Sequence, residues 1–346
     1  MWRPLAQTSG RLLRASRTGQ AMSHRRLQLR RCAAVELVDV PSKHSSEPSE
    51  RPPRSDGKAP KALRDLKLGF IGWGAMAQAV SLGLVRRGLT ERQSIMATDI
   101  VPEMVEALGR KGLQAAASNK DLVNWADVIV VAVKPQVVDK VIAEISGHWT
   151  GNKMLVSICA GITIDQYLHG LGADAKVVRV MPNTPCLVGE AATAYAGSAS
   201  CTDWHLDLVH GMFAAVGGAT HRVPEYLLNA VTGLSGSGPA YVYMLVQALS
   251  DAGVYGGLPR NVALSLATQT VIGAARMVQE SDDHPSVLKE AVTSPAGTTI
   301  AGVRVLERCG FNSAIIEAVE AARARSEELS KTPDFLFEKL PRKPST

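Results

Sequence analysis

The sequence predicts an α/β domain with a parallel sheet, followed by an all-α domain. Short apolar runs alternate with helical patterns from residue 66 to residue 223, as they do in a doubly wound sheet. From residue 224 to residue 331, long segments with apolar residues at helical spacing replace that alternation. The length of 346 residues allows two domains with a large core.

Composition and charge restrict the classes of function. Residues 1–65 carry 14 Lys/Arg against 6 Asp/Glu, whereas residues 66–346 carry 24 against 26. The part predicted to fold is nearly neutral, which argues against a nucleic-acid-binding protein. The five cysteines form no CxxC pair and no metal-ligand spacing, which indicates a reducing compartment and no metal site. No apolar run reaches the roughly 18 residues that a membrane span needs.

The N-terminal 65 residues are predicted to be a disordered extension. Residues 1–35 contain eight arginines and no acidic residue, a composition typical of a mitochondrial transit peptide. Five prolines then lie among serines and mixed charges between residues 41 and 60, as in a disordered linker. We therefore expect mitochondrial localisation. The alternative is an accidental upstream extension of a cytoplasmic protein, since translation could also start at Met22. Residues 332–346 are expected to form a short tail.

A glycine motif follows the first predicted strand, which ends at Ile71. It reads Gly72-Trp73-Gly74-Ala75-Met76-Ala77, a G-x-G-x-x-A pattern between a strand and a helix. In such a motif the first glycine permits a tight turn, and the second lets the backbone approach a pyrophosphate. The final small residue keeps the helix close to the strand. This context predicts a Rossmann-type dinucleotide-binding domain over residues 66–223, with residues 71–77 at the cofactor. The alternative is an ordinary turn.

Asp99 is the candidate residue for cofactor choice. It ends the second predicted strand, 25 residues beyond Gly74, where an acid can bond the adenosine ribose hydroxyls. A carboxylate there repels the 2′-phosphate of NADPH, and no arginine follows within the next ten residues. NADH is therefore favoured over NADPH. An equally supported alternative, compatible with the first, is that Asp99 caps the helix predicted to begin near Pro102.

Other strand ends are expected to complete the cofactor site, because ligands of doubly wound sheets bind at the carboxyl ends of the strands. Further strands are predicted over 127–135, 153–161 and 175–185, and two more segments, 190–196 and 217–223, could extend the sheet antiparallel. The candidate cofactor residues at these ends are Val133, Lys134, Pro135, Ala160 and Asn183, with Asn119 added as either a ligand or a helix cap. Lys134 could neutralise cofactor phosphates or be solvated only.

The second half is predicted to be helical. One long helix spans about residues 226–257 and is interrupted by three glycines and Pro239. Further helices are expected from Pro259, near 284–292, up to about Glu307, and from about residue 312 to residue 330. His284 suits a cap or surface role. The apolar residues on these helices exceed what one compact bundle would hide, so a second copy of the chain is expected to cover them.

Two helical motifs carry a resemblance to a known family. "AVTGLSGSGPAYVY" (230–243) and "SPAGTTIAGVRVLE" (294–307) resemble pyrroline-5-carboxylate reductases of the animal type. The resemblance covers about residues 66–330, with the glycine motif and the segments 133–135 and 183–185 in the family's order. It implies hydride transfer from NADH or NADPH to a cyclic imine, giving L-proline in the last step of proline biosynthesis. It also implies a helical dimerisation and substrate domain, and a homodimer or higher oligomer in which one subunit's nucleotide meets the other's loop at 294–299.

The loop at 294–299 contains no residue that titrates near neutrality. Reduction of a protonated imine needs positioning rather than an acid or a base. The backbone amides of Gly297, Thr298 and Thr299, at the start of a helix, form an anion site suited to the substrate carboxylate. The resemblance implies that the Thr299 hydroxyl bonds the ring nitrogen, as the candidate catalytic residue. Without the resemblance, a plain loop and helix cap would be the better interpretation.

The chain departs from the family pattern at one residue of the loop. Many family members have two glycines where this chain has Ala296 and Gly297, and alanine should be tolerated if its φ is negative.

Two rival functions are also considered. A 3-hydroxyacid or 6-phosphogluconate-type dehydrogenase also joins a Rossmann domain to helices. That chemistry needs a catalytic lysine, which the segment "LSGSGPAYVYML" lacks. A non-catalytic dinucleotide-binding regulator would require a broken substrate loop, and this loop is intact.

Overall fold

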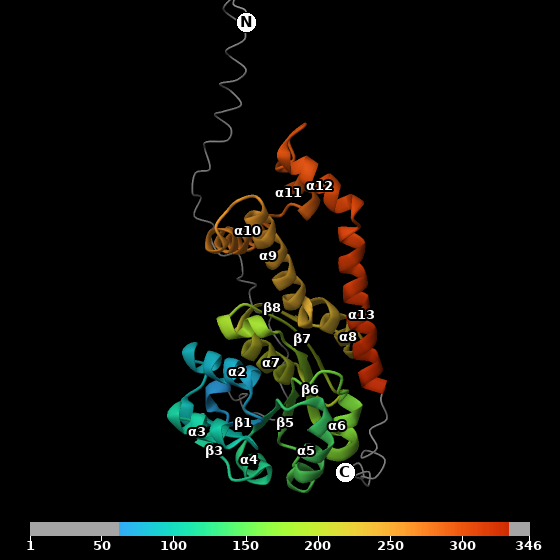
Figure 1. Ribbon diagram of the computed structural model, residues 1–346. Helices are drawn as coiled ribbons and strands as arrows, with labels where there is room; N and C mark the ends of the chain where they lie inside the picture. Colours follow the sequence, from blue (N-terminus) through green and yellow to red (C-terminus); the bar gives the residue numbers. More distant parts are fainter. Residues whose placement is uncertain (1–61, 332–346) are drawn as a thin grey trace, which may run out of the picture. The chain divides into compact units, whose positions relative to one another are not determined.

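The computed structural model describes residues 62–331 (Figure 1). The predicted transit peptide, nearly all of the predicted linker and the C-terminal tail lie outside the described residues. Leu63–Asp65, which were assigned to the extension, form the short 3₁₀ turn η1. Leu63 packs against the core of the α/β part. Ordered structure therefore begins a few residues before the predicted boundary.

The described strands form one eight-stranded sheet in the order β3-β2-β1-β4-β5-β6-β7-β8. The first six are parallel, β7 is antiparallel to β6, and β8 is parallel to β7. The last two strands thus run against the main direction, as predicted. The bounds are β1 Leu68–Ile71, β2 Ile95–Thr98, β3 Gln114–Ala115, β4 Val128–Val131, β5 Met154–Ser157, β6 Lys176–Met181, β7 Ala191–Gly197 and β8 Gly217–Arg222.

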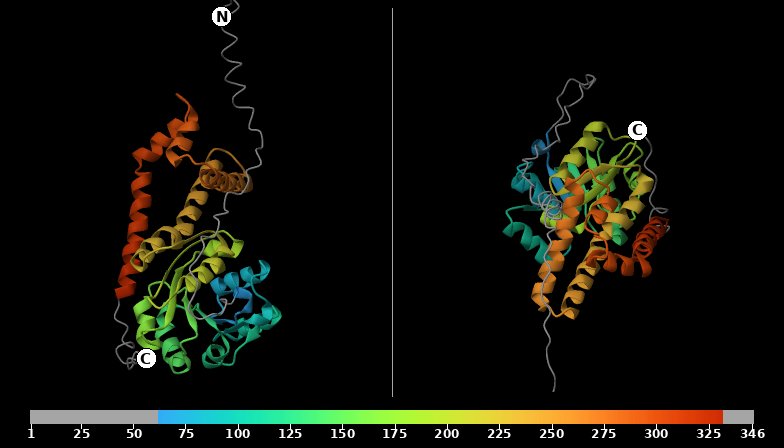
Figure 2. Two further views of the ribbon diagram at one scale, coloured as in Figure 1. Left: turned by 180° about the vertical axis from the view of Figure 1, so that it is seen from behind. Right: turned by 90° about the horizontal axis from the view of Figure 1, so that it is seen from above.

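Helices cover both faces of this sheet (Figure 2). Alternate residues of β4 face opposite cores: Val128 and Val130 join one cluster, whereas Ile129 and Val131 join the other. The first cluster includes residues of α2, α3 and α7, and the second includes residues of α4, α5 and α6. Their bounds are α2 Ala75–Arg86, α3 Pro102–Arg110, α4 Asn119–Trp125, α5 Val138–Ile145, α6 Ile164–Leu171 and α7 Asp203–Ala214. Burial on both faces explains why the parallel strands are continuous apolar runs.

The predicted interrupted helix is confirmed as three segments. These are α8 (Leu228–Val231), the π-helical turn η7 (Thr232–Gly236) and α9 (Gly238–Tyr255). In η7 the N–H of Ser237 donates to the carbonyl of Thr232, five residues earlier, at 2.8 Å. Pro239 lies in the first turn of α9, where its missing N–H is tolerated best.

The remaining helices follow the predicted order. They are α10 Arg260–Glu280, α11 Pro285–Ala291, α12 Thr298–Arg308 and α13 Phe311–Lys331. For His284, predicted to have a cap or surface role, the structure shows the cap: its ring accepts a hydrogen bond from the N–H of Ser286 at the start of α11. None of the helices in residues 62–331 combines the length and the apolar character that crossing a bilayer requires.

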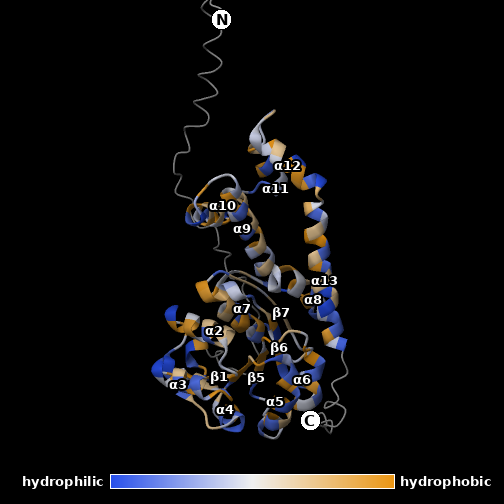
Figure 3. Cartoon of the chain, in the orientation of Figure 1, coloured by the Kyte–Doolittle hydropathy of each residue, from blue (hydrophilic) through white to orange (hydrophobic). Residues whose placement is uncertain are grey.

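Helices α9 to α13 keep many large apolar residues exposed. Hydrophobic residues recur along these helices in Figure 3. Helices α9 and α10 pack on each other, and the missing side chain of Gly253 lets Ala263 approach closely. Both helices nevertheless keep large apolar residues exposed, several of which line a groove between the two helices. Their exposed residues include Val242, Tyr243, Met244, Leu249, Leu264, Leu266 and Ile272. Exposure on this scale is typical of a surface that another protein molecule covers.

Candidate functional site: a dinucleotide turn and an acid-free loop

The turn after β1 is built around two glycines with different requirements. Gly72 has a φ of +91°, and a side chain there would lie 2.8 Å from the carbonyl oxygen of Ala132. Gly74 is the N-cap of α2, and a side chain there would meet nothing within 4 Å. Gly74 and Ala75 are exposed, and Met76 is half-buried. The turn therefore leaves open space in front of the unpaired amides of the first turn of α2.

Trp73 does not offer its side chain to a ligand. The indole is fully buried and meets Phe70 edge-on, with ring centroids 5.9 Å apart. The backbone N–H of Trp73 donates to Oδ2 of Asp99 at 2.7 Å. Ile71 and Ala77 are buried as well. These three residues, which were predicted at the cofactor, support the turn from the core.

Asp99 is not the N-cap of α3, which is Val101, but its carboxylate has two partners within the protein. Its Oδ2 holds the glycine turn through Trp73, and its Oδ1 accepts from the N–H of Val101 at 2.9 Å. Val101 is the N-cap residue of α3, so Asp99 also steadies the start of that helix. Each carboxylate oxygen keeps a second acceptor site. The half-buried carboxylate can therefore still accept a ribose hydroxyl at the end of β2.

Asn119 begins α4 but does not cap that helix. Ser118 is the cap of α4, since its hydroxyl accepts from the N–H of Asp121. The amide of Asn119 instead accepts from the Thr98 hydroxyl and donates to Glu144 Oε2, both at 2.7 Å. One amide hydrogen remains for a ligand. No sequence signal marked Glu144, because it lies 25 residues away on α5.

The ends of β4 and β5 adjoin the turn. Val133 crowds the space where a side chain on Gly72 would lie, and its carbonyl accepts from the Cys159 thiol at 3.2 Å. Burial raises the pKa of the Cys159 thiol, so this group stays protonated near neutrality. Lys134 is exposed, and Pro135 begins a 3₁₀ turn, Pro135–Val137. Ala160 follows Cys159 and is half-buried. The predicted residues at these two strand ends thus share one edge of the sheet with Gly72.

Asn183 departs from its predicted arrangement. Its side chain is buried, with 9% of the residue exposed. Its oxygen accepts from the N–H of Ala192 at 3.0 Å, and its nitrogen donates to the carbonyl of Ser235 at 3.1 Å. The oxygen and the nitrogen of this amide, which was predicted to bind the cofactor, thus each have a partner within the protein, and the side chain is buried. The partners were not predictable because Ser235 lies 52 residues away.

The loop before α12 presents fewer free amides than expected. The N–H of Gly297 donates to the carbonyl of Ser294 at 3.0 Å and is not available to a substrate. The N–H of Ala301 returns to Gly297, so the amides of Thr298, Thr299 and Ile300 precede the first intrahelical bond. Thr298 and Thr299 are exposed. The anion site therefore begins at Thr298 rather than at Gly297.

The backbone at Ala296 does not have the negative φ at which alanine was expected to be tolerated. Its φ is +56°, and it is the one non-glycine residue with positive φ among residues 62–331. Left-handed backbone disfavours alanine because the side chain approaches a carbonyl oxygen. Alanine is therefore present here at a cost, in a loop that family members often build with glycine.

Within one chain the two half-sites remain open. Gly74 is exposed at the nucleotide turn, and Thr298 and Thr299 are exposed at the loop. Neither half covers the other in the way that hydride transfer between two bound rings requires. The exposed apolar faces of α9 and α10 show where a further molecule could supply the missing cover.

Two family models match the chain. Residues 225–329 match the pyrroline-5-carboxylate reductase dimerisation family, and residues 67–161 match the family described as NADP oxidoreductase, coenzyme F420-dependent. The first match covers η7, the helices α8 to α12 and nearly all of α13. The second covers the glycine turn and the strand ends beside it. Both halves of the candidate site thus lie in matched segments.

Relatives and solved structures agree with these matches. The pyrroline-5-carboxylate reductase of Arabidopsis thaliana is 43% identical over 79% of this chain and 99% of its own length. The pyrroline-5-carboxylate reductase of Escherichia coli is 42% identical over 77% of this chain and 99% of its own length. The NADP-bound pyrroline carboxylate reductase of Plasmodium falciparum superposes with a TM-score of 0.72 at 33% identity, over 78% of this chain and all of that one. On this fold, site and identity, the chain belongs to the pyrroline-5-carboxylate reductase family.

Proposed function

We propose that this protein reduces 1-pyrroline-5-carboxylate to L-proline, the last step of proline biosynthesis, with NADH or NADPH as hydride donor. The observation that carries the proposal is the pairing, in one chain, of an open dinucleotide turn with an exposed loop of amides and hydroxyls that has no acid or base. Relatives of that name, aligned over nearly their whole length, support it.

The described residues fit a dinucleotide. Open space at Gly74 and the free amides of α2 suit a diphosphate, and Asp99 and Asn119 retain hydrogen-bonding capacity beside it. When bound, the nicotinamide ring supplies the hydride. The protein's task is to hold the two rings at near-attack distance, about 3–3.5 Å, and to keep bulk water out.

The loop supplies substrate contacts. The amides of Thr298 and Thr299, at the positive end of α12, suit the substrate carboxylate. The Thr299 hydroxyl bonds the ring nitrogen, which carries its own proton from solution in the iminium form. The imine carbon is already electrophilic in that form, so no residue has to act as a strong acid or base.

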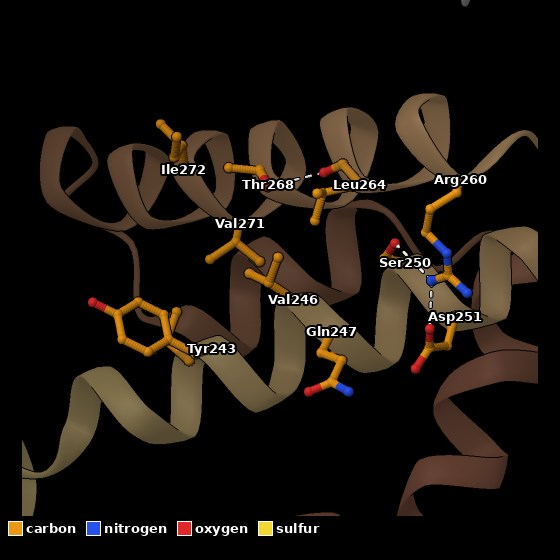
Figure 4. A pocket seen from close by; sticks show the side chains of 11 residues that line it. Tyr243, Val246, Gln247, Ser250, Asp251, Arg260, Leu264, Thr268, Val271 and Ile272 are labelled. Atoms are coloured by element: carbon orange, nitrogen blue, oxygen red, sulfur yellow. Dashed lines mark hydrogen bonds and ion pairs between the residues drawn. The ribbon is translucent and has the colours of Figure 1, made fainter.

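A second copy of the chain is proposed to complete the site. The exposed half-sites, the uncovered helices and the match to a dimerisation family support a homodimer in which each loop serves its partner's nucleotide. A groove of about 570 Å³ between α9 and α10 offers an apolar seat for a partner helix (Figure 4). Its lining includes Tyr243, Val246, Leu264, Val271 and Ile272.

Asp99 supports a preference for NADH. A carboxylate about 4 Å from a 2′-phosphate, at a surface-like dielectric, costs up to a few kcal/mol before screening. We expect a higher kcat/KM with NADH and a narrowed or reversed ratio in Asp99→Ser, measured at one pH and salt concentration. A wild-type preference for NADPH, or an unchanged ratio in the variant, would reduce Asp99 to its structural role.

Mitochondrial targeting is proposed from the arginine-rich, acid-free residues 1–35. A fluorescent reporter fused behind these residues tests the proposal directly. Import into mitochondria supports it, and a diffuse cytosolic signal rejects it.

The reductase proposal is tested by cofactor oxidation. Purified protein should oxidise NADH or NADPH only when 1-pyrroline-5-carboxylate is present, and proline should accumulate in equal amount. A dehydrogenase of the 3-hydroxyacid type would instead reduce NAD⁺ or NADP⁺ with a hydroxy acid. A regulator would bind the cofactor without turnover.

A further inference from the structure

The carbonyl of Ser235 lacks the partner that a continuous helix would give it. In an α-helix the carbonyl of one residue accepts from the N–H four residues later. That residue is Pro239, which has no N–H. The π-helical turn at Thr232–Gly236 and the start of α9 therefore leave the Ser235 carbonyl in need of a donor from elsewhere.

Asn183 supplies this donor from the end of the sheet. Its side-chain nitrogen donates to the Ser235 carbonyl at 3.1 Å, while its oxygen accepts from Ala192 on β7 at 3.0 Å. Both contacts fix which way the amide faces, because the acceptor side meets an N–H and the donor side meets a carbonyl. Aspartate has the same shape but no donor at neutral pH, so it could keep only the contact to Ala192.

Other contacts show that the bend rests on β6. A side chain on Gly236 would lie 2.5 Å from the terminal methyl of Met181, the last residue of β6. Earlier in the same strand, buried Arg179 pairs with Glu225 at 3.1 Å and bonds Asn229 at 3.5 Å. Residues 225–236 are therefore tied at two places, to β6 by the Arg179–Glu225 ion pair and to the segment after β6 by the Asn183 amide.

We propose that Asn183 is a positioning residue for hydride transfer rather than a cofactor ligand. Through Ser235 it sets the angle at which α9 leaves the nucleotide edge of the sheet. Helix α9 packs on α10, which leads through α11 to the loop at 294–299. The same contact thus governs where the helices present the substrate loop and the surface proposed for the second copy. This inference rests on the proposed reductase function.

The test compares Asn183→Asp with the wild type and with Asn152→Asp. Asn152 is an exposed turn residue before β5, at the opposite end of that strand from the nucleotide site. We expect kcat to fall about tenfold or more in Asn183→Asp, with Kd for NADH and NADPH, measured by fluorescence, within about twofold of wild type. The control should match the wild type in both. An unchanged kcat, or a large loss of cofactor affinity with kcat retained at saturation, would overturn the proposal.

A second variant separates positioning from folding stability. Adding Pro239→Ala restores an N–H that can satisfy the Ser235 carbonyl without reconnecting it to β6. Asn183→Asp is expected to lower Tm as well as kcat, because the Ser235 carbonyl loses its donor. The double variant Asn183→Asp/Pro239→Ala should regain much of that Tm but not the lost kcat. Recovery of kcat together with Tm would show that the Asn183 bond only stabilises the fold.

Hydrogen exchange keeps the two proposals distinguishable. Asn183→Asp should speed amide exchange in residues 232–241 and leave residues 72–77 unchanged. If the wild type shows no imine reduction, the proposed function fails. The exchange measurement still decides whether Asn183 holds the π-helical turn and the start of α9 in place. Unchanged exchange at 232–241, or a change confined to 72–77, would contradict the proposal.

Discussion

At Ala296 the loop before α12 adopts a backbone conformation that the residue's own side chain disfavours. Its φ of +56° lies in the left-handed region. Alanine in this conformation costs about 1–2 kcal/mol of folding free energy relative to right-handed backbone. Glycine would avoid most of that cost, but its more flexible unfolded chain would cost about 0.5–1 kcal/mol of stability. The net cost of alanine relative to glycine at this residue is therefore small.

We expect Ala296→Gly to raise the free energy of unfolding by up to about 1 kcal/mol, because the strain is removed. Urea denaturation of both proteins, at the same protein concentration, measures this. The comparison uses one common slope m for the dependence of the unfolding free energy on urea concentration. Gly112→Ala is the converse control, since Gly112 also has positive φ (+70°) and should lose stability on gaining a side chain. A destabilised Ala296→Gly would mean that the loop is not strained at this residue.

Thr299 is the residue on which turnover should depend most directly. We expect Thr299→Ala to lower kcat/KM by the equivalent of about 1–3 kcal/mol, because the proposed hydrogen bond to the reacting ring would be lost. Stability should change little, since Thr299 is exposed in a single chain. Thr299→Ser, which keeps the hydroxyl, is the control and should retain most activity. Steady-state kinetics with normal kcat/KM in a folded Thr299→Ala protein would remove Thr299 from the mechanism.

At the scale of elements, α13 is held to the π-helical turn by a close backbone approach. A side chain on Gly233 would lie 2.5 Å from the carbonyl oxygen of Val319 and 3.0 Å from the nitrogen of Arg323. Nearby, the Tyr241 hydroxyl lies 3.4 Å from the Gly233 carbonyl and 3.3 Å from that of Ala318. Because the clashing atoms belong to backbone, a new side chain cannot be accommodated by a rotamer change.

We therefore expect Gly233→Ala to lower the free energy of unfolding by about 1–3 kcal/mol through overpacking. The matched control is Gly273→Ala in α10, where a side chain would meet nothing within 4 Å. That variant should be neutral or gain up to about 1 kcal/mol from helix propensity. Thermal and urea unfolding measure the change in unfolding free energy of the two variants. Equal changes in both would contradict the close backbone approach at Gly233.

At the scale of the whole molecule, the uncovered faces of α9 and α10 predict assembly. Leu264 lines the groove between these helices and is 48% exposed in the single chain. Leu264→Glu places a charge where a partner should pack, so we expect the oligomer to dissociate and reductase activity to fall with it. Ile100→Glu, at a residue 97% exposed on the α/β part, should leave assembly unchanged. Sedimentation velocity measures the oligomeric state of both variants. An intact Leu264→Glu oligomer would exclude this face as the interface between copies of the chain.

The sequence by itself determined the order of strands and helices and the place of the nucleotide turn. Apolar alternation, the G-x-G-x-x-A motif and the proline and glycine breaks act over a few residues, so a local pattern reveals them. The strand ends were therefore located, and their small and polar residues were correctly placed along one edge. His284, predicted to have a cap or surface role, caps α11 through Ser286, only two residues later.

Only the tertiary structure decided what those residues bind. Asp99 holds Trp73 across 26 residues, Asn119 holds Glu144 across 25, and Asn183 holds Ser235 across 52. The positive φ of Ala296 and the occupied amide of Gly297 likewise depend on how the loop closes on Ser294. A polar side chain at a strand end can turn to a ligand or to a distant segment. The choice belongs to the packing of the whole chain, which brings that segment within hydrogen-bonding distance.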